Sequence, residues 1–387
     1  MSCPSSPFLG IVSRALTSRL QSARHLSSCL ATASVASDEP GRGVKLQHTH
    51  VLTDHARGIF LPYAVADAYQ NMLRAPFFAW KDCLSVSQSR LDGLCREPNT
   101  PDASAAAAAS PSTPSPPPQT PPLPQLLTFV SAPTFTLGRR QIASQSVEFL
   151  NESSLLHEAL TIPGCTEWKH HHMTPLPYQI SQDDIGKTAQ IAPQTIQTSR
   201  GGLTTYHGPG QLVVWPVIDL HSPLHRHYTL RCYARLLEET TRAVLAATYG
   251  IATHLDEAEP GVWAGAQAVA PPTHAERKIS AMGVHVRRHV TALGVAVNVN
   301  VSVAGPVSVN PWARFVPCGL EDRAVTNVAH EMGLSADGRD GVYRDVDNVL
   351  DMEALAAAWA SEFARRLGLV GVNQVRVDAL EMVNRAA

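Results

Sequence analysis

The sequence predicts an α/β fold, in which helices and strands alternate along the chain. Residues 229–249 repeat apolar side chains at helical spacing, and Gly250 follows where a helix C-cap would stand. From Val295 to Val303, valines alternate with small or polar residues, which is the period of a strand with one buried face. The hydrophobic content of 44% is enough to fill a sizeable core around such elements.

Shorter signals place the elements of the first half of the chain. Residues 61–74 predict a helix that ends before Pro76, because a proline inside a helix removes a hydrogen bond. Residues 126–130 and 212–217 are apolar runs that predict buried strands. Pro216 is tolerable there only near the edge or the end of a strand.

A hairpin and a last helix follow towards the C-terminus. Val284 and Val286 precede a charged turn at residues 287–289, so this run and the valine-rich strand predict a hairpin. Residues 349–367 again carry helical spacing, and Gly368 stands at the expected end of that helix.

Composition excludes several classes of protein. The 31 basic and 33 acidic residues give a net charge of -2, so the whole chain has no field for gathering nucleic acid or an anionic membrane. No stretch reaches the roughly 20 apolar residues that cross a bilayer. The 7 cysteines are odd in number and include no C-x-x-C pair, which argues against a disulfide framework and for a reducing compartment.

The N-terminal residues have the composition of a mitochondrial transit peptide. Arg14, Arg19 and Arg24 are interspersed with many serines, and no acidic residue occurs before Asp38. Apolar residues between positions 8 and 20 fall near helical spacing, as in a basic amphipathic helix. We therefore expect residues 1–42 to be a transit or disordered segment, and the protein to work in the mitochondrial matrix.

Two further stretches look like insertions into one domain. Residues 97–124 combine an alanine run with dense proline, so they can neither fill a core nor sustain a sheet. Residues 143–195 form a second, irregular stretch that contains Cys165 and the run His170–His172. A zinc site is one interpretation of that run; a solvated histidine cluster is favoured, because no second ligand pair stands at metal spacing.

Three segments carry residues suited to chemistry. Residues 200–211 place four glycines and a proline around Tyr206 and His207, and such a loop exposes backbone amides to a ligand. Lys278 stands at the start of an apolar strand. Cys318 lies between proline and glycine at a sharp turn, where a neighbouring ammonium would lower its pKa and raise the thiolate fraction.

Together these segments resemble the lipoyl(octanoyl) transferase family. The matching stretches are, in the family's order, RGGLTTYHGPGQLVVWPVIDL, GVWAG, KISAMGVHV and FVPCGLEDRAVTNV, with weaker support from LPYAVADAYQ and PTFTLGRRQ. The resemblance implies a single catalytic domain over residues 45–385, interrupted by the two inserts. It also implies a biotin/lipoate protein ligase-like fold, with a mixed sheet flanked by helices.

The resemblance assigns roles to individual residues. Cys318 would be the acyl-accepting nucleophile and Lys278 the partner that activates it, with neither a metal nor a cofactor. The implied substrate-binding residues are Arg200, Gly201, Gly202, Leu203, Thr204, Thr205, Tyr206, His207, Ala281, Met282, Gly283, Gly294, Val295 and Ala296. The chain departs from the family at Leu293, where a histidine is usual, and at Asn327, where a serine is common.

The implied activity is transfer of an octanoyl group from acyl carrier protein to a lysine of lipoyl domains, those of 2-oxoacid dehydrogenases and of the glycine cleavage H protein. Glycines 201, 202, 283 and 294 would leave room for the acyl chain. Acyl carrier proteins are acidic, so Arg139, Arg140, Arg200 or the turn at 287–289 could offer a complementary patch. Two alternatives stay open: an ATP-dependent lipoate or octanoate ligase, and a non-catalytic relative that binds acylated carrier protein.

Overall fold

The computed structural model describes residues 43–54, 57–94, 120–140, 176–179, 188–265, 276–315, 324–334 and 350–386. All of them lie within one compact unit, Gly41–Ala387. The predicted transit segment and the histidine run at 170–172 lie outside the described residues, as does most of the proline-rich insert.

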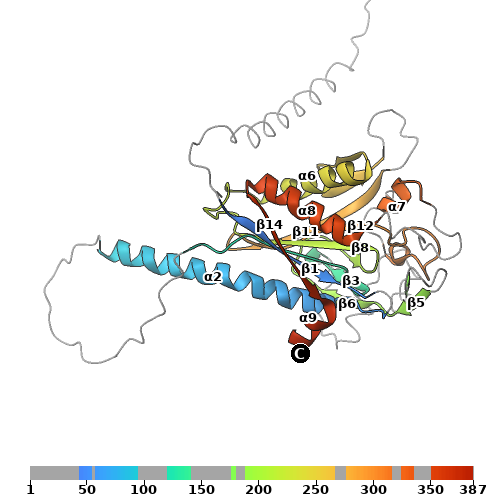
Figure 1. The fold of residues 1–387 in the computed structure, drawn as a ribbon, viewed down its shortest axis with the longest axis horizontal. Coiled ribbons are helices and arrows are strands. Elements are labelled where there is room, and N and C mark those ends of the chain that lie inside the picture. The colour runs from blue at the N-terminus through green and yellow to red at the C-terminus, as the bar shows by residue number, and fades with distance from the viewer. Residues whose placement is uncertain are drawn as a thin grey trace, which may run out of the picture. The chain divides into compact units, whose positions relative to one another are not determined.

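A nine-stranded mixed sheet is the centre of the described part of the chain (Figure 1). Its order is β14-β1-β2-β8-β12-β11-β10-β9, and β13 pairs with β11. The strands are β1 Lys45–Leu52, β2 Gln125–Phe129, β8 Gln211–Val217, β9 Thr253–Leu255, β10 Gly261–Ala264, β11 Arg277–Arg287, β12 Val290–Asn298, β13 Ala324–Val325 and β14 Gly371–Asp378. β1 is parallel to both β14 and β2, whereas the pairs from β2 to β9 are antiparallel.

Helices cover both faces of this sheet (Figure 1). One face carries α6 Leu230–Tyr249 and α8 Met352–Leu367, and the other carries α2 Tyr63–Leu94 and α9 Ala379–Ala386. A short helix, α7 Val328–Glu331, and a 3-10 turn, η1 Pro311–Arg314, follow the loops after β12. Smaller sheets are formed by β3 Thr134–Leu137 between β6 Gln194–Gln197 and β7 Thr205–His207, and by β4 Leu176–Gln179 with β5 Thr188–Ile191.

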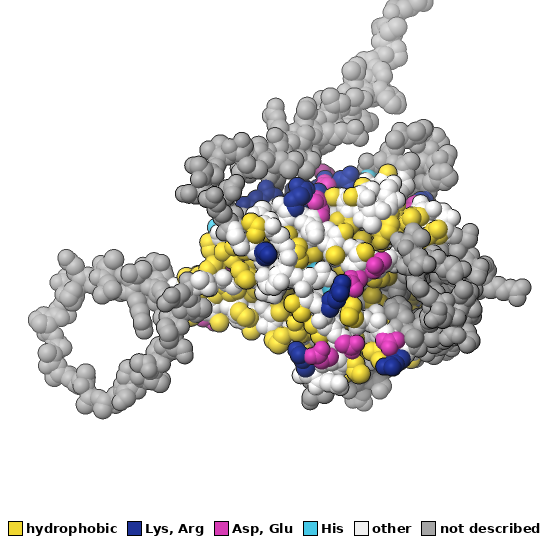
Figure 2. All heavy atoms as spheres, viewed as in Figure 1, with side chains coloured by type: hydrophobic (Ala, Val, Ile, Leu, Met, Phe, Trp, Pro, Cys, Tyr) yellow, Lys and Arg dark blue, Asp and Glu magenta, His cyan; other side chains and the backbone are white. Residues whose placement is uncertain are grey.

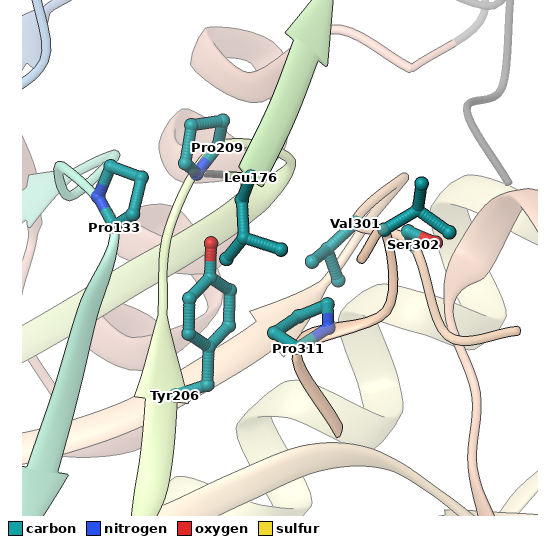
Figure 3. A pocket seen from close by; sticks show the side chains of 8 residues that line it. Pro133, Leu176, Tyr206, Pro209, Val301, Ser302 and Pro311 are labelled. Atoms are coloured by element: carbon teal, nitrogen blue, oxygen red, sulfur yellow. The ribbon is translucent and has the colours of Figure 1, made fainter. Parts of the chain in front are cut away.

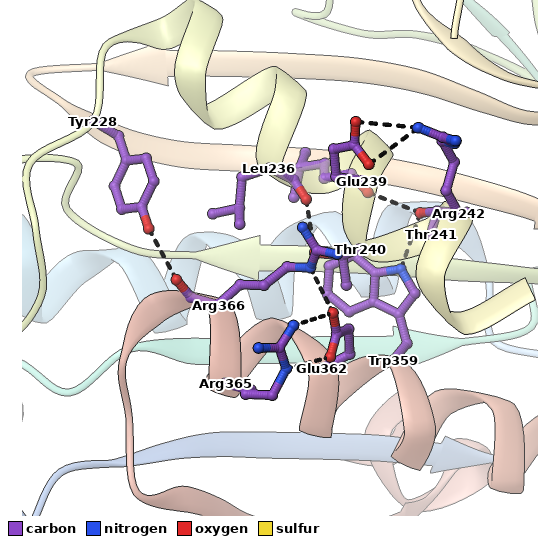
Figure 4. A network of polar contacts seen from close by, with 11 residues as sticks. Tyr228, Leu236, Glu239, Thr240, Thr241, Arg242, Trp359, Glu362, Arg365 and Arg366 are labelled. Atoms are coloured by element: carbon purple, nitrogen blue, oxygen red, sulfur yellow. Dashed lines mark hydrogen bonds and ion pairs between the residues drawn. The ribbon is translucent and has the colours of Figure 1, made fainter. Parts of the chain in front are cut away.

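The predicted helices α6 and α8 form where their caps indicate. Gly250 and Gly368 follow the two helices with φ angles of 69° and 79°, which is the left-handed conformation that glycine adopts most readily. Two hydrogen bonds connect this region (Figure 4). Trp359 Nε1 on α8 donates to Thr241 Oγ1 on α6 at 3.0 Å, and the hydroxyl of Tyr228, just before α6, donates to the Arg366 carbonyl on α8 at 3.3 Å. Trp359 itself is fully buried, so its hydrogen bond to Thr241 lies inside the core between the two helices and the sheet.

The predicted hairpin between β11 and β12 is also confirmed. Its two turn residues, Arg288 and His289, have φ angles of 51° and 66°, as a two-residue type I′ turn requires. The valine-rich strand, however, ends at Asn298 and is buried on both faces. The backbone N–H groups of residues 299–301 all reach the Gly210 carbonyl instead of a neighbouring strand, which is why the alternation continues in sequence but the strand does not.

The prediction that the first helix ends before Pro76 is wrong, because α2 continues to Leu94 with Pro76 inside it. Tertiary contacts hold its second half. Phe77 is 2% exposed and packs against strand residues of the sheet, and the Lys81 ammonium lies 2.7 Å from the Asp219 carboxylate. These contacts offset the hydrogen bond that the proline removes.

Part of the 143–195 stretch has regular structure, since β4, β5 and the start of β6 lie in it. None of the described helices is long and apolar enough to cross a membrane. Acidic and basic side chains lie next to each other at several places on the face shown in Figure 2, in keeping with the small net charge.

Candidate functional site

The glycine-rich loop at 198–210 is fixed to the turn that follows β3. The Arg139 N–H donates to the Arg200 carbonyl at 3.0 Å, and the Arg140 N–H donates to the Gly202 carbonyl at 3.2 Å. Only glycine fits at position 138, because a Cβ there would lie 2.3 Å from the Gly202 oxygen. The two predicted motifs, RGG and TLGRR, therefore form one structural unit.

The Arg200 side chain extends from this loop to Gly283 in the middle of β11. Its side chain is 7% exposed, and one terminal nitrogen donates to the Thr136 carbonyl at 2.6 Å and to Thr136 Oγ1 at 3.0 Å. The methylene groups of Arg200 cover Gly283, since a Cβ on that glycine would lie 2.7 Å from Arg200 Cδ. The structure thus brings the first and second predicted motifs together.

Strand geometry divides the predicted substrate residues on β11 and β12 between two faces. Met282 and Val295 pair with each other and pack in the core under the helices α6 and α8. The other four are Ala281, Gly283, Gly294 and Ala296, and they alternate with these two along the strands. Because side chains alternate along a strand, the four belong to the opposite face, on the side of Arg200.

The expectation that glycines 283 and 294 leave room for an acyl chain needs correction. The space beside Gly283 is occupied by Arg200, and a Cβ on Gly294 would lie 2.2 Å from the Val214 carbonyl oxygen. Gly294 therefore allows close approach of β8. Gly201, by contrast, has no atom within 4 Å of a Cβ placed on it and is exposed.

A buried polar network links the glycine-rich loop to the neighbourhood of Lys278. His207 Nδ1 lies 2.8 Å from Gln211 Oε1, Gln211 Nε2 donates to Asn298 Oδ1 at 2.9 Å, and Asn298 Nδ2 donates to the Thr326 carbonyl at 3.0 Å. An amide oxygen can only accept, so His207 carries its proton on Nδ1 and presents Nε2 as an acceptor. Burial lowers the pKa of His207 to about 4, so its imidazole is neutral at pH 7.

Tyr206 points to the other side of β7, into an apolar cluster. It packs against Phe135 and Trp312, with ring centroids 5.3 and 5.9 Å away, and burial raises its pKa. It also lines a small hollow (Figure 3), whose other lining residues are Pro133, Leu176, Pro209, Val301, Ser302, Val309 and Pro311. Lys278 and Arg200 do not line this hollow. Thr204 and Thr205 are buried next to it in sequence, and Leu203 is partly exposed.

Lys278 is held in a buried position at the start of β11. Its residue is 7% exposed; Nζ donates to the Pro260 carbonyl at 3.2 Å and lies 4.6 Å from the centroid of the Trp263 ring. Within the described residues, no carboxylate lies at ion-pair distance from this ammonium. Glu238, buried on α6, is the carboxylate whose charge acts on Lys278 from beyond that distance. A lysine buried in this way differs from a solvated surface charge.

Cys318, the predicted nucleophile, lies outside the described residues. The chain is described again from residue 324, where β13 runs parallel to β11 and Val325 pairs with Lys278. The Thr326 N–H also donates to the Lys278 carbonyl at 3.0 Å. Val325 and Thr326, a few residues after Cys318, therefore lie beside Lys278.

Both departures from the family pattern are accommodated by the fold. Leu293 is 4% exposed and packs with Tyr63 and Trp215, and its N–H donates to Gln70 Oε1 at 3.2 Å despite a φ angle of 60°. Asn327 caps α7 by accepting from the His330 N–H at 2.7 Å. Asparagine and serine are equivalent N-caps, so the capping role of a serine is retained.

Replacing Asn327 by alanine is expected to lower the free energy of unfolding by about 2 kcal/mol, because the cap and the hydrogen bond from Asn327 Nδ2 to the Val301 carbonyl, at 2.7 Å, are both lost. Asn327→Ser keeps the cap and should lose about half as much. Urea unfolding measures both changes. Equal losses in the two variants would contradict the capping role.

Sequence reasoning missed the residues that support the site. Gln211 and Asn298 lie inside quoted or alternating stretches, but only the fold shows that they share hydrogen bonds. Trp263, under the Lys278 ammonium, was visible only as part of the GVWAG motif. Among the described residues, no group of histidine, cysteine, aspartate or glutamate side chains is arranged to hold a metal ion.

Comparison with known proteins shows which family part of the chain resembles. The family model described as "Lipoyl protein ligase A/B catalytic domain" matches residues 184–363. This range is 180 of the 387 residues, so the match covers a little less than half of the chain. An octanoyltransferase from Flavobacterium johnsoniae is 39% identical over 147 residues, which is 37% of this chain and 56% of that protein. An octanoyltransferase from Mycobacterium ulcerans is 37% identical over 169 residues, 43% of this chain and 64% of that protein.

These matches confirm the predicted fold class and the resemblance to octanoyltransferases, while a mitochondrial form stays a prediction. The chain spans less than two thirds of the length of these two relatives, at 56% and 64%. A solved bipartite lipoate protein ligase with its E2 lipoyl domain, from Thermoplasma acidophilum, aligns over 89% of this chain and 91% of that one, with 11% identity and a TM-score of 0.37. That similarity is too low to bear on the site.

Proposed function

We propose that this protein transfers an octanoyl group from octanoyl-acyl carrier protein to a lysine of lipoyl domains, through a thioester on Cys318. The observation that carries the proposal is the buried Lys278 ammonium, which lies beyond ion-pair distance from every carboxylate of the described residues, with Glu238 acting on it only from farther away. Its strand also pairs with β13, at Val325, a few residues after Cys318. The identity to octanoyltransferases from several bacteria gives independent support.

The reaction divides into two exchanges. In the first, the Cys318 thiolate attacks the carrier thioester, its sulfur gains the acyl group, and the carrier leaves as a thiolate. In the second, the lysine amine of a lipoyl domain attacks, the C–S bond to Cys318 breaks and an amide forms. Lys278 would stabilise the Cys318 thiolate as an ammonium and give its proton to the departing carrier thiolate in the first exchange. As the neutral amine it would then accept the proton of the attacking lysine in the second, while the Cys318 sulfur leaves as a thiolate. An amide is more stable than a thioester, so no ATP is needed.

The remaining site residues would bind and orient the substrate. Neutral His207 can accept a hydrogen bond on Nε2, and Gln211 holds that tautomer in place. The exposed amides near Gly201 are candidates to bind the developing oxyanion. The acceptors would be the lipoyl domains of 2-oxoacid dehydrogenases and the glycine cleavage H protein. A mitochondrial matrix location is part of this proposal and rests on the composition of residues 1–42.

Intact-mass measurement after mixing with octanoyl-carrier protein tests the proposal. The wild-type protein should gain one octanoyl group that hydroxylamine removes, and Cys318→Ala should gain none. Cys232→Ala is the matched control, since Cys232 lies on α6 away from the site, and it should still be acylated. An adenylate formed from free octanoate and ATP would instead identify a ligase, and the absence of any adduct on the folded wild type would leave a binding protein.

A further inference from the structure

Arg74, on α2, has a buried guanidinium whose hydrogen-bonding capacity is mostly unused. The residue is 7% exposed. One terminal nitrogen donates to Asn71 Oδ1 at 3.1 Å, but within the described residues Nε and the other terminal nitrogen meet no acceptor. A guanidinium has five N–H donors, and leaving them unpaired in a buried position costs free energy. This position therefore favours a bound acceptor.

Arg139, Arg287 and His285, which come from other parts of the chain, act on or lie near Arg74. Phe78 is contacted by two guanidinium groups, with Arg74 Cζ 5.1 Å and Arg287 Cζ 5.6 Å from its ring centroid. His285, on β11, has a pKa below its usual value because of burial first and then the charges of Arg74, Arg139 and Arg287. We call Arg74, Arg139, Arg287 and His285 the arginine cluster.

The acidic residues nearby do not neutralise the arginine cluster. Asp67 is the carboxylate whose charge acts on Arg74, yet burial raises the pKa of Asp67, and it lies beyond ion-pair distance from the guanidinium. Asp82 pairs with Arg288 instead, at 2.7 Å. Within the part of the chain that the structure describes, none of Arg74, Arg139 and Arg287 forms an ion pair with a carboxylate. Repulsion between like charges at this distance is relieved most directly by an anion.

We propose that the arginine cluster binds an oxyanion of the phosphate type. A phosphate offers several acceptor oxygens that match the fork of a guanidinium, and Arg74 would supply a buried anchor while Arg139 and Arg287 approach from the surface. Ser199 Oγ, 3.1 Å from His285 Nδ1, adds a further polar group. The cluster is next to the candidate active site, since His285 follows Gly283 by two residues on the same face of β11.

The phosphate could be a free ion or part of a larger molecule, such as the phosphopantetheine arm of a carrier protein. Only the second source rests on the proposed function. Binding of the oxyanion itself is independent of acyl transfer, so its test needs no activity measurement. A failed phosphate test would leave the Cys318 adduct unaffected, and a missing adduct would leave the phosphate test valid.

Thermal unfolding in the presence of inorganic phosphate tests the site, with sodium chloride added to keep ionic strength constant. Phosphate at about ten times its Kd should raise the Tm of the wild type by about 3 °C, and the rise should continue with the logarithm of its concentration, because a ligand that binds only the native state stabilises it. Arg74→Met keeps an unbranched apolar stem and removes the charge. It should have a higher Tm than wild type without phosphate and no rise with phosphate.

Arg140→Met is the matched control, because Arg140 is an exposed neighbour of Arg139 and its loss changes the net charge equally. It should keep the phosphate response. Arg287→Met, at an exposed position, provides a second test that does not alter the core, and its affinity for phosphate should fall about tenfold. Equal responses to phosphate in wild type, Arg74→Met and Arg287→Met would overturn the proposal.

The two sources are separated with 4′-phosphopantetheine and with pantetheine, which lacks the phosphate. Tighter binding of 4′-phosphopantetheine than of inorganic phosphate, lost in Arg74→Met, would assign the site to the arm of a carrier. Equal affinities would assign it to a free phosphate. Pantetheine alone should not change the Tm, and a rise with pantetheine equal to that with its phosphate would contradict oxyanion binding.

Discussion

Lys278→Met is expected to slow octanoyl transfer about 10³-fold while the protein stays folded. Methionine is unbranched, so it can follow the same path over the Trp263 ring, but it removes the ammonium that would stabilise the Cys318 thiolate and the amine that would accept a proton. Single-turnover measurements with octanoyl-carrier protein give the rate. Alkylation of Cys318, followed by peptide mass spectrometry, should shift to higher pH in the variant.

Lys278→Arg separates the two roles of the lysine. Arginine keeps the positive charge but cannot give up its proton, so it can support the thiolate and cannot act as a base. Acylated Cys318 should therefore form and then persist when a lipoyl domain is added. Lys45→Met removes an exposed lysine at the start of β1 and should transfer at the wild-type rate. Wild-type transfer by Lys278→Met would exclude Lys278 from the mechanism.

The elements that sequence predicts well are those whose ends carry a local signal. Gly250 and Gly368 end α6 and α8 because a left-handed residue costs glycine little, whatever surrounds it. The turn at Arg288 and His289 is likewise determined by short-range geometry. The helix α2 shows the limit of such signals. Pro76 is a strong local stop, but contacts of Phe77 and Lys81 with the sheet, invisible in sequence, carry the helix past it.

The candidate site divides in the same way. Motif resemblance finds Arg200, His207 and Lys278. The structure adds that the Arg200 side chain covers Gly283 of β11 and that hydrogen bonds connect His207 to the neighbourhood of Lys278. The motif resemblance alone does not indicate which side chains fill the space around these three residues. Whether Gly283 is empty or covered depends on a side chain 83 positions earlier in the chain, and the network through Gln211 depends on strand pairing between β8 and β12. These facts are set by tertiary contacts.

Gly294→Ala is expected to lower the free energy of unfolding by about 3 kcal/mol. The added Cβ would lie 2.2 Å from the Val214 carbonyl oxygen and 2.9 Å from Pro216 Cδ, so two strands in the interior of the nine-stranded sheet would have to separate. Urea unfolding gives the change. The same loss should appear in the unliganded protein, since the clash is with backbone and involves no substrate.

Gly201→Ala is the matched control, because the family resemblance gives both glycines the same role in substrate binding. No atom lies within 4 Å of a Cβ at position 201, so its free energy of unfolding should stay within about 0.5 kcal/mol of wild type. If Gly201 does border the substrate, the effect of its substitution should fall on KM alone. A Gly294→Ala protein as stable as the wild type would contradict the close approach of β8 to this glycine. The expectation that Gly294 leaves room for the acyl chain would then be supported instead.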